Sequence, residues 1–68
     1  MYAHLIGANL AHSNLSSVNF YGAVLSEANL SFTNLSYADL SNTNVFGANI
    51  FQADLTYANL TNIDNWEQ

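Results

Sequence analysis

Apolar residues recur along this chain at every fifth position from residue 5 to residue 60. All twelve of these positions are apolar: Leu5, Leu10, Leu15, Phe20, Leu25, Leu30, Leu35, Leu40, Val45, Ile50, Leu55 and Leu60. A small residue stands two places before the apolar one in eleven of the twelve units, and Asn or Asp stands between them in ten, with His4 and Val24 as the departures. A fixed period over nearly the whole chain dictates the architecture.

The period of five excludes ordinary elements. Five residues advance an α-helix by about 500°, so the apolar positions would wind around it and leave no stripe. Side chains of a strand alternate with period two, so an odd spacing would send successive apolar residues to opposite faces. The pattern therefore predicts short extended pieces joined by corners, with the apolar residue always pointing inward. Stacked coils of this kind form a β-solenoid.

Units such as Ala53-Asp54-Leu55-Thr56-Tyr57 and Ala28-Asn29-Leu30-Ser31-Phe32 resemble the pentapeptide-repeat family. The resemblance runs from about Ala3 to Thr61. It implies an all-β fold, a right-handed, quadrilateral, parallel β-helix with one pentapeptide on each side. At about twenty residues per coil, the chain is expected to form just over three coils. The four sides and the handedness come from the resemblance, because a period of five alone allows other polygons.

The repeat pattern ends after Leu60. Ile63 is large where a small residue belongs, and Asn65 is polar where the central apolar residue belongs. We therefore expect the solenoid to occupy residues 1–62 and residues 63–68 to form an exit or cap segment. In that segment, Ile63 and Trp66 are positioned to cover the last coil.

The charged residues are five acids, with no Lys or Arg. Nucleic acids and anionic membrane surfaces are bound through Lys and Arg, so neither is an expected direct partner. The chain has no Cys, and no apolar run approaches the 18 or so residues of a membrane span. With no signal or membrane segment in the sequence as given, we expect a cytoplasmic location.

The polar side chains favour structural roles. Short amides bond to nearby backbone at corners and can form stacked ladders, so the Asn and Asp positions are better explained by structure than by binding of carbohydrate or calcium. His4 and His12 occupy different slots of the repeat, and no third ligand is evident, so no metal site is expected. No catalytic set can be assembled from the sequence. The protein is expected to have no cofactor and not to be an enzyme.

The aromatic residues fall mostly in outward positions. If positions twenty apart stack, Tyr37 lies under Tyr57 and Phe46 lies under Trp66. One side collects Ile6, Val24, Phe46 and Trp66, and it is flattened by glycines and lacks the usual Asn twice. Two interpretations stay open: the exposed aromatics form a self-packing ladder, or they form a contact patch for a partner.

The leading functional hypothesis is a non-enzymatic structural or protein–protein interaction module. Its exposed apolar side or its open ends would bind another protein or a second copy, giving a homo-oligomer or a docked module. The alternative comes from the resemblance, because quinolone-resistance members of the family protect DNA gyrase by imitating DNA. Three coils at about 4.8 Å span roughly 15 Å, and duplex DNA of that length carries about nine charges. This chain has five carboxylates, which counts against mimicry.

Overall fold

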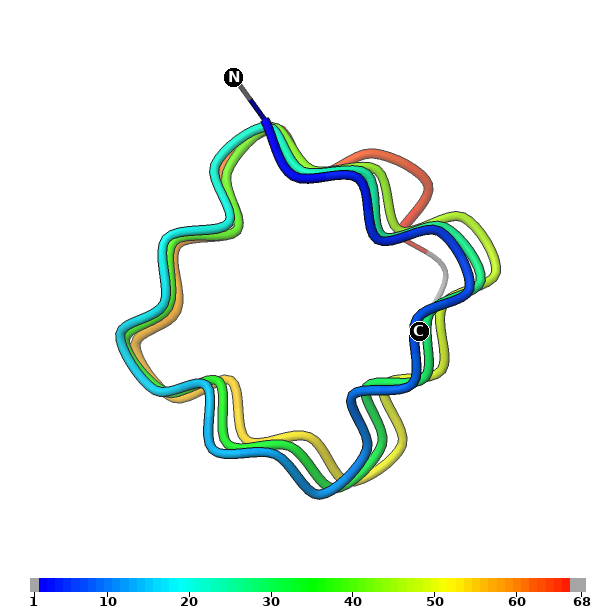
Figure 1. Cartoon of the computed structure of the whole chain (residues 1–68). Helices are drawn as coiled ribbons and strands as arrows, with labels where there is room; N and C mark the ends of the chain where they lie inside the picture. Colours follow the sequence, from blue (N-terminus) through cyan, green and yellow to red (C-terminus); the bar gives the residue numbers. More distant parts are fainter. Residues whose placement is uncertain (1, 67–68) are drawn as a thin grey trace.

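The backbone of this computed structural model, which describes residues 2–66, winds in coils of twenty residues. Parallel bridges join residues twenty apart along the chain, from His4 with Val24 to Asn44 with Asp64. The complete coils are residues 3–22, 23–42 and 43–62, and a further coil begins at residue 63. Viewed along the axis, the coils superpose in a four-cornered outline (Figure 1).

Each coil has four sides, and each side is one pentapeptide. Side 1 comprises residues 3–7, 23–27, 43–47 and 63–66; side 2 comprises 8–12, 28–32 and 48–52; side 3 comprises 13–17, 33–37 and 53–57; side 4 comprises 18–22, 38–42 and 58–62. We number each corner after the side that it ends. The four-sided outline that the resemblance implied is therefore the one this chain adopts, whereas its right-handedness stays an expectation from the resemblance.

Every corner is a tight turn closed by one backbone hydrogen bond. The carbonyl of the central apolar residue accepts the N–H three residues later, as Leu5 accepts from Ala8 at 3.0 Å. The second residue of each corner has a positive φ, between 56° and 70°. A single positive φ at this place is typical of a type II turn, which favours glycine. Glycine fills only three of these places, Gly7, Gly22 and Gly47, so the other corners hold side-chain-bearing residues in the left-handed region.

Backbone hydrogen bonds hold neighbouring coils together. The N–H of Leu5 donates to the carbonyl of Val24 at 2.8 Å, and the N–H of Val24 donates back to Ala3 at 2.9 Å. The corner adds a third bond, from Gly7 to Ser26 at 2.9 Å. Within residues 2–66 the bridges remain isolated single residues, and no longer strand forms. The extended pieces are this short because two of every five residues belong to a corner.

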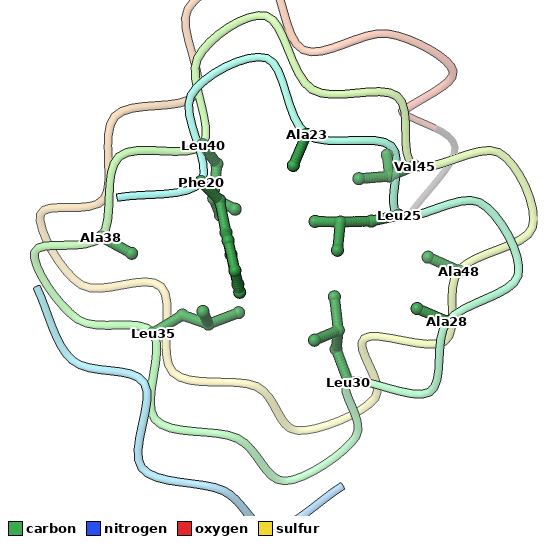
Figure 2. Packing of buried hydrophobic residues seen from close by; sticks show 10 residues of the cluster. All are labelled: Phe20, Ala23, Leu25, Ala28, Leu30, Leu35, Ala38, Leu40, Val45 and Ala48. Atoms are coloured by element: carbon green, nitrogen blue, oxygen red, sulfur yellow. The ribbon is translucent and has the colours of Figure 1, made fainter. Parts of the chain in front are cut away.

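The inside of the solenoid is filled by the central apolar residues and by the small residues that precede them (Figure 2). Leu25, Leu30 and Leu35 are essentially without solvent exposure. Alanines at the preceding position let the opposite sides approach closely, and four of them are buried: Ala23, Ala28, Ala38 and Ala48. All twelve residues of the inward column either belong to the buried cluster or pack against it.

Burial is greatest in the middle of the stack. On side 3, Leu35 is fully buried, whereas Leu15 in the coil before it and Leu55 in the coil after it are only half-buried. The same contrast holds on side 2, where Leu30 is buried between the half-buried Leu10 and Ile50. On sides 2 and 3 each outer coil is covered by a neighbour on one face only, so both ends of the column expose apolar surface there, whereas Val45 on side 1, where a further coil begins, is buried.

Two threonines, Thr33 and Thr43, occupy the small-residue position two places before the central residue, where alanine is usual. Neither leaves its hydroxyl unpaired. The Oγ1 of Thr33 donates to the carbonyl of Leu30 at 2.7 Å, and Thr43 does the same to Leu40 at 2.7 Å. The turn bond from each threonine N–H to the same carbonyl measures 3.3 Å. The hydroxyl and the amide thus share one acceptor, which satisfies a buried hydroxyl inside an apolar column.

Candidate interaction surfaces

The Asn and Asp side chains brace the corners of their own repeats. In each of the ten repeats that carries one, its Oδ1 accepts the backbone N–H two residues later; the acceptors are Asn9, Asn14, Asn19, Asn29, Asn34, Asp39, Asn44, Asn49, Asp54 and Asn59. In the second and third coils, a Ser or Thr that follows the central residue also donates its hydroxyl to that oxygen, as Ser36 does to Asn34 at 2.7 Å. Ser26 is the exception, because Val24 offers no such oxygen. These are Asx turns, so the prediction of a structural role is supported.

The prediction of stacked Asn ladders is wrong for the part of the chain that the structure describes. The one amide-to-amide bond between coils runs from Asn65 Nδ2 to Asn44 Oδ1 at 2.9 Å. Each Oδ1 is already turned toward the corner of its own repeat, and the backbone supplies the bonds between coils. The side-chain amides therefore stabilise the turns and not the stacking.

Side 1 lacks this brace in two of its coils. His4 and Val24 stand where Asn44 stands in the third coil, and neither offers an Oδ1. The backbone N–H groups of Ile6 and Ser26 therefore have no side-chain acceptor in their own repeats, whereas Asn44 accepts from Phe46 at 3.1 Å. An N–H without this acceptor can donate a hydrogen bond to an oxygen of a partner molecule.

The same side exposes large apolar side chains. Ile6 is 63% exposed, Phe46 is 53% exposed and Trp66 is 37% exposed, while Val24 is half-buried. Ser26 stands between Ile6 and Phe46 in the column, so these two do not form a continuous ridge. We call Ile6, Val24, Phe46 and Trp66 the side 1 patch.

Aromatic rings at the other corners pack on one another. Tyr37 stacks on Tyr57, as the twenty-residue spacing predicted, with centroids 5.3 Å apart and an angle of 22°. At corner 2, His12 stacks on Phe32 at 5.0 Å, and Phe32 meets Phe51 edge to face at 5.6 Å. The ring contacts at corner 2 were not predicted from the sequence. The contact between Phe32 and Phe51 follows a spacing of nineteen residues. The backbone brings these two residues together, because the N–H of Phe32 donates to the carbonyl of Phe51 in the next coil.

The predicted placement of Phe46 under Trp66 gives no ring contact between these two among residues 2–66. The reason lies at Asn65, which has a φ of 63° although it occupies the central position of its unit and not the second corner position. This change of phase diverts the chain before Trp66. Figure 1 shows the last described segment leaving the outline of the coils. The two interpretations of the aromatics therefore apply to different corners. Rings pack on one another at corners 2 and 3, and at corner 4, where Tyr2 meets Tyr21 edge to face. Phe46 on side 1 is exposed and makes no ring contact with another aromatic side chain of residues 2–66.

The exit segment begins as a further repeat. The N–H of Ile63 closes the turn from Leu60 at 3.2 Å, and Ile63 packs against the core. The backbone of Asp64 then pairs with the third coil: its N–H donates to Thr43 at 2.7 Å, and its carbonyl accepts from Val45 at 3.1 Å. Residue 1 of the expected solenoid and residues 67–68 of the expected exit segment lie outside the described residues.

Two carboxylates are held in the ionised state by local hydrogen bonds. The Ser41 hydroxyl, followed by the Ser41 backbone N–H, lowers the pKa of Asp39 from its ordinary value of 3.8. The hydroxyl and N–H of Thr56 lower the pKa of Asp54 in the same way. Asp39 lies on side 4, Asp54 on side 3, and Glu27 and Asp64 on side 1. Carboxylates spread over three sides do not trace the phosphate rows of a duplex.

Within residues 2–66 the surface shows no pocket, and no three potential metal-binding side chains gather at one place. His12 is engaged with Phe32, and His4 lies on side 1 beside Val24. The same residues contain no helix with the length and hydropathy that crossing a bilayer requires. The surfaces that remain as candidates for function are therefore flat and lie on the outside of the solenoid.

Comparison with known families gives one match. The family described as pentapeptide repeats matches residues 3–42, 13–50 and 28–64, with eight copies of the repeat. Together these segments span residues 3–64, which is most of the chain. No curated protein matches this sequence.

Proposed function

Because this chain belongs to the pentapeptide-repeat family, whose repeats form a right-handed β-helix and act generally as structural or interaction modules, we propose that it is a non-enzymatic protein-binding module. Its contact surface is the side 1 patch, and its occupant is a second copy of the chain or another protein. The observation that carries the proposal is the coincidence, on one side, of exposed apolar side chains with the two missing Asx braces.

The physical argument starts from Val24. An Asn at this position would accept the N–H of Ser26, as Asn44 accepts that of Phe46 at 3.1 Å. A hydrogen bond of this kind contributes about 1 kcal/mol, so an outward valine forgoes that stabilisation. Contact with an apolar partner surface offsets the loss, and a partner oxygen can accept the free N–H. Large exposed apolar groups are also what the centre of a protein interface requires.

Side 1 is open to close approach at its first corner, where a Cβ built on Gly7 would meet nothing within 4 Å. At Gly47 the Glu27 side chain covers the corner, since a Cβ there would lie 3.3 Å from the Glu27 Cγ. The half-buried leucines of the outer coils offer a second apolar surface at each end of the stack, which a neighbour covering the column would bury. The enzyme class has no support from any surface of residues 2–66, because catalysis needs converging groups around a substrate.

The experiment is the double variant Val24→Asn with Phe46→Ser, compared with the parent by sedimentation equilibrium and circular dichroism. Serine is a tolerated residue at this corner, because Ser26 occupies the same column. We expect the parent to associate and the variant to dissociate with its β-sheet signal unchanged. The matched control is Phe51→Ser at corner 2, where Ser31 likewise occupies the column; it should leave the association unchanged. A monomeric parent that captures no partner protein, or an assembly that the double variant does not weaken, would disprove the proposal.

A further inference from the structure

The Tyr37–Tyr57 pair at corner 3 is the most exposed aromatic feature of residues 2–66. Tyr57 is 78% exposed and Tyr37 is 64% exposed, although the two rings stack at 5.3 Å. Stacking covers one face of each ring and leaves the other face open. Beyond Tyr37 the column continues with Ser17, whose N–H bonds to Ser36 at 2.8 Å, and a serine is too small to cover a tyrosine ring. The pair therefore presents two aromatic faces at a fixed place.

Ionised carboxylates flank this pair on both sides of the corner. Asp54 lies on side 3, three residues before Tyr57, and Asp39 lies on side 4, two residues after Tyr37. Each uses Oδ1 to accept from its own corner, through Thr56 and Ser41 respectively. The second oxygen of each carboxylate accepts no hydrogen bond from any residue between 2 and 66. It is thus free to accept from a partner.

This protein offers no Lys or Arg side chain to these groups, because the sequence has neither residue and carries a net charge of −5 with His neutral. Aromatic faces attract cations through the ring quadrupole, and exposed carboxylates attract them directly. We propose that corner 3 is a recognition site for an arginine-bearing segment of a partner protein, with the guanidinium stacked on the open face of Tyr57 or Tyr37 and paired with Asp54 or Asp39. This inference names the chemistry of a partner and rests on the proposed role as a protein-binding module, but it uses a different surface from the side 1 patch.

Arginine fits the site better than lysine or a neutral side chain. Its guanidinium is planar, stacks on aromatic rings, and presents paired donors that match a carboxylate. An ammonium group is compact and strongly hydrated, and it cannot stack and make paired bonds together. Charge excludes a nucleic acid as the occupant, because the site is anionic.

The test titrates the full chain with the peptide acetyl-Gly-Arg-Gly-Arg-Gly-amide and follows the tyrosine ring protons by NMR. The matched peptide carries citrulline, which keeps the shape of arginine without its charge, and a lysine version separates guanidinium from ammonium. We expect shifts of the Tyr37 and Tyr57 rings with the arginine peptide, weaker binding of the lysine peptide, and no shifts with citrulline. Because exposed ion pairs are screened, binding should weaken as salt increases.

Two variants remove the proposed contacts without disturbing the fold. Tyr37→Ser/Tyr57→Ser places at both positions the residue that Ser17 already provides, and it should weaken arginine-peptide binding about tenfold, since each exposed ring contributes about two- to fivefold. Asp39→Asn/Asp54→Asn retains the Oδ1 acceptors, because Asn34 makes the same two bonds, and should weaken binding about fivefold. The control Glu27→Gln/Asp64→Asn also removes two negative charges, but it removes them from side 1. Peptide binding should therefore change by less than about twofold.

Several outcomes overturn the inference. Equal binding of the citrulline or lysine peptide would remove the guanidinium as the recognised group. If Asp39→Asn/Asp54→Asn and Glu27→Gln/Asp64→Asn weaken peptide binding equally, the net charge of the protein, and not the position of the carboxylates at corner 3, explains the binding. The variant Ile6→Ser/Phe46→Ser distinguishes this inference from the proposed function: loss of self-association with peptide binding intact supports a separate site. Absence of peptide binding by a chain that self-associates through side 1 would defeat the corner 3 site alone.

Discussion

The ring of Tyr2 lies directly against Gly22, so that a Cβ added at Gly22 would come within 2.9 Å of the Tyr2 Cγ. Tyr2 also meets Tyr21 edge to face, with centroids 5.7 Å apart. Gly22 and Gly7 have the same φ of 69°, but the surroundings of Gly7 are open. Comparing substitutions at Gly7 and Gly22 therefore separates the cost of the positive φ, which both positions share, from the cost of a clash with Tyr2, which arises only at Gly22.

Replacing Gly7 by Ala should cost about 1 kcal/mol of the free energy of unfolding, because it places a side chain in the left-handed region. Gly22→Ala should cost more, because the new methyl group also displaces Tyr2. In a Tyr2→Ala background the cost of Gly22→Ala should decrease to that of Gly7→Ala, as urea denaturation of the four variants can measure. Equal costs in the parent would show that Tyr2 does not rest on Gly22.

Side 3 offers a graded test of the core. Leu35→Ala, in the middle coil, should destabilise by about 2–5 kcal/mol, because it leaves a cavity that neighbours cannot fill. Leu15→Ala and Leu55→Ala, at half-buried positions of the outer coils, should each cost about half as much or less. Leu35→Asp should unfold the chain, since a charge would lie unpaired in the column. Thermal unfolding of the set provides the comparison, and equal costs for all three leucines would contradict open ends.

The Asx braces should be measurable one at a time. Asn34→Ala removes the acceptor of the Ser36 N–H and hydroxyl, and should cost about 1 kcal/mol. Asn34→Asp should keep both bonds, as Asp54 does in the next coil of the same side, and should cost only about 0.5 kcal/mol, because the new carboxylate lies opposite that of its bridge partner Asp54. Val24→Ala is the control without a brace to lose. Chemical denaturation followed by circular dichroism gives the free energies, and a neutral Asn34→Ala would mean that the braces add nothing to stability.

Acid should destabilise the fold through Asp39 and Asp54. Because folding lowers the pKa of both carboxyls below the ordinary value of 3.8, their contribution is complete above that pH and is lost as the pH falls through the lower folded values. The melting temperature should therefore fall below about pH 4. The variant Asp39→Asn/Asp54→Asn should show a shallower decrease, since amide oxygens keep accepting at low pH. An identical decrease in parent and variant would assign the acid effect elsewhere.

The inward column could be predicted because it depends only on the period of the sequence. The twenty-residue coil, and with it the Tyr37–Tyr57 stack, could be predicted only through the family resemblance, because a period of five alone allows other polygons. The Asn side chains were harder to predict, because the identity of a hydrogen-bond partner depends on the rotamer, and the same residue type serves a ladder or a turn. The position of Trp66 depended on the φ of Asn65, which no pattern specifies. The site at corner 3 depends on the order of sides around the coil. That order places Asp54 and Asp39 on either side of one tyrosine pair although they are fifteen residues apart.

The ladder bonds of this chain all join residues nineteen or twenty-one positions apart, as Leu5 to Val24 and Val24 to Ala3 illustrate. Apart from the local bonds of its corners, a coil can therefore form no backbone hydrogen bonds until a loop of one full circuit has closed. We expect the slow step of folding to be the first pairing of two circuits. Once it has occurred, each further residue needs only to settle on a template already in place. The middle coil takes part in both pairings, so its residues should govern the rate of folding, whereas substitutions in the outer coils should act mainly on the rate of unfolding.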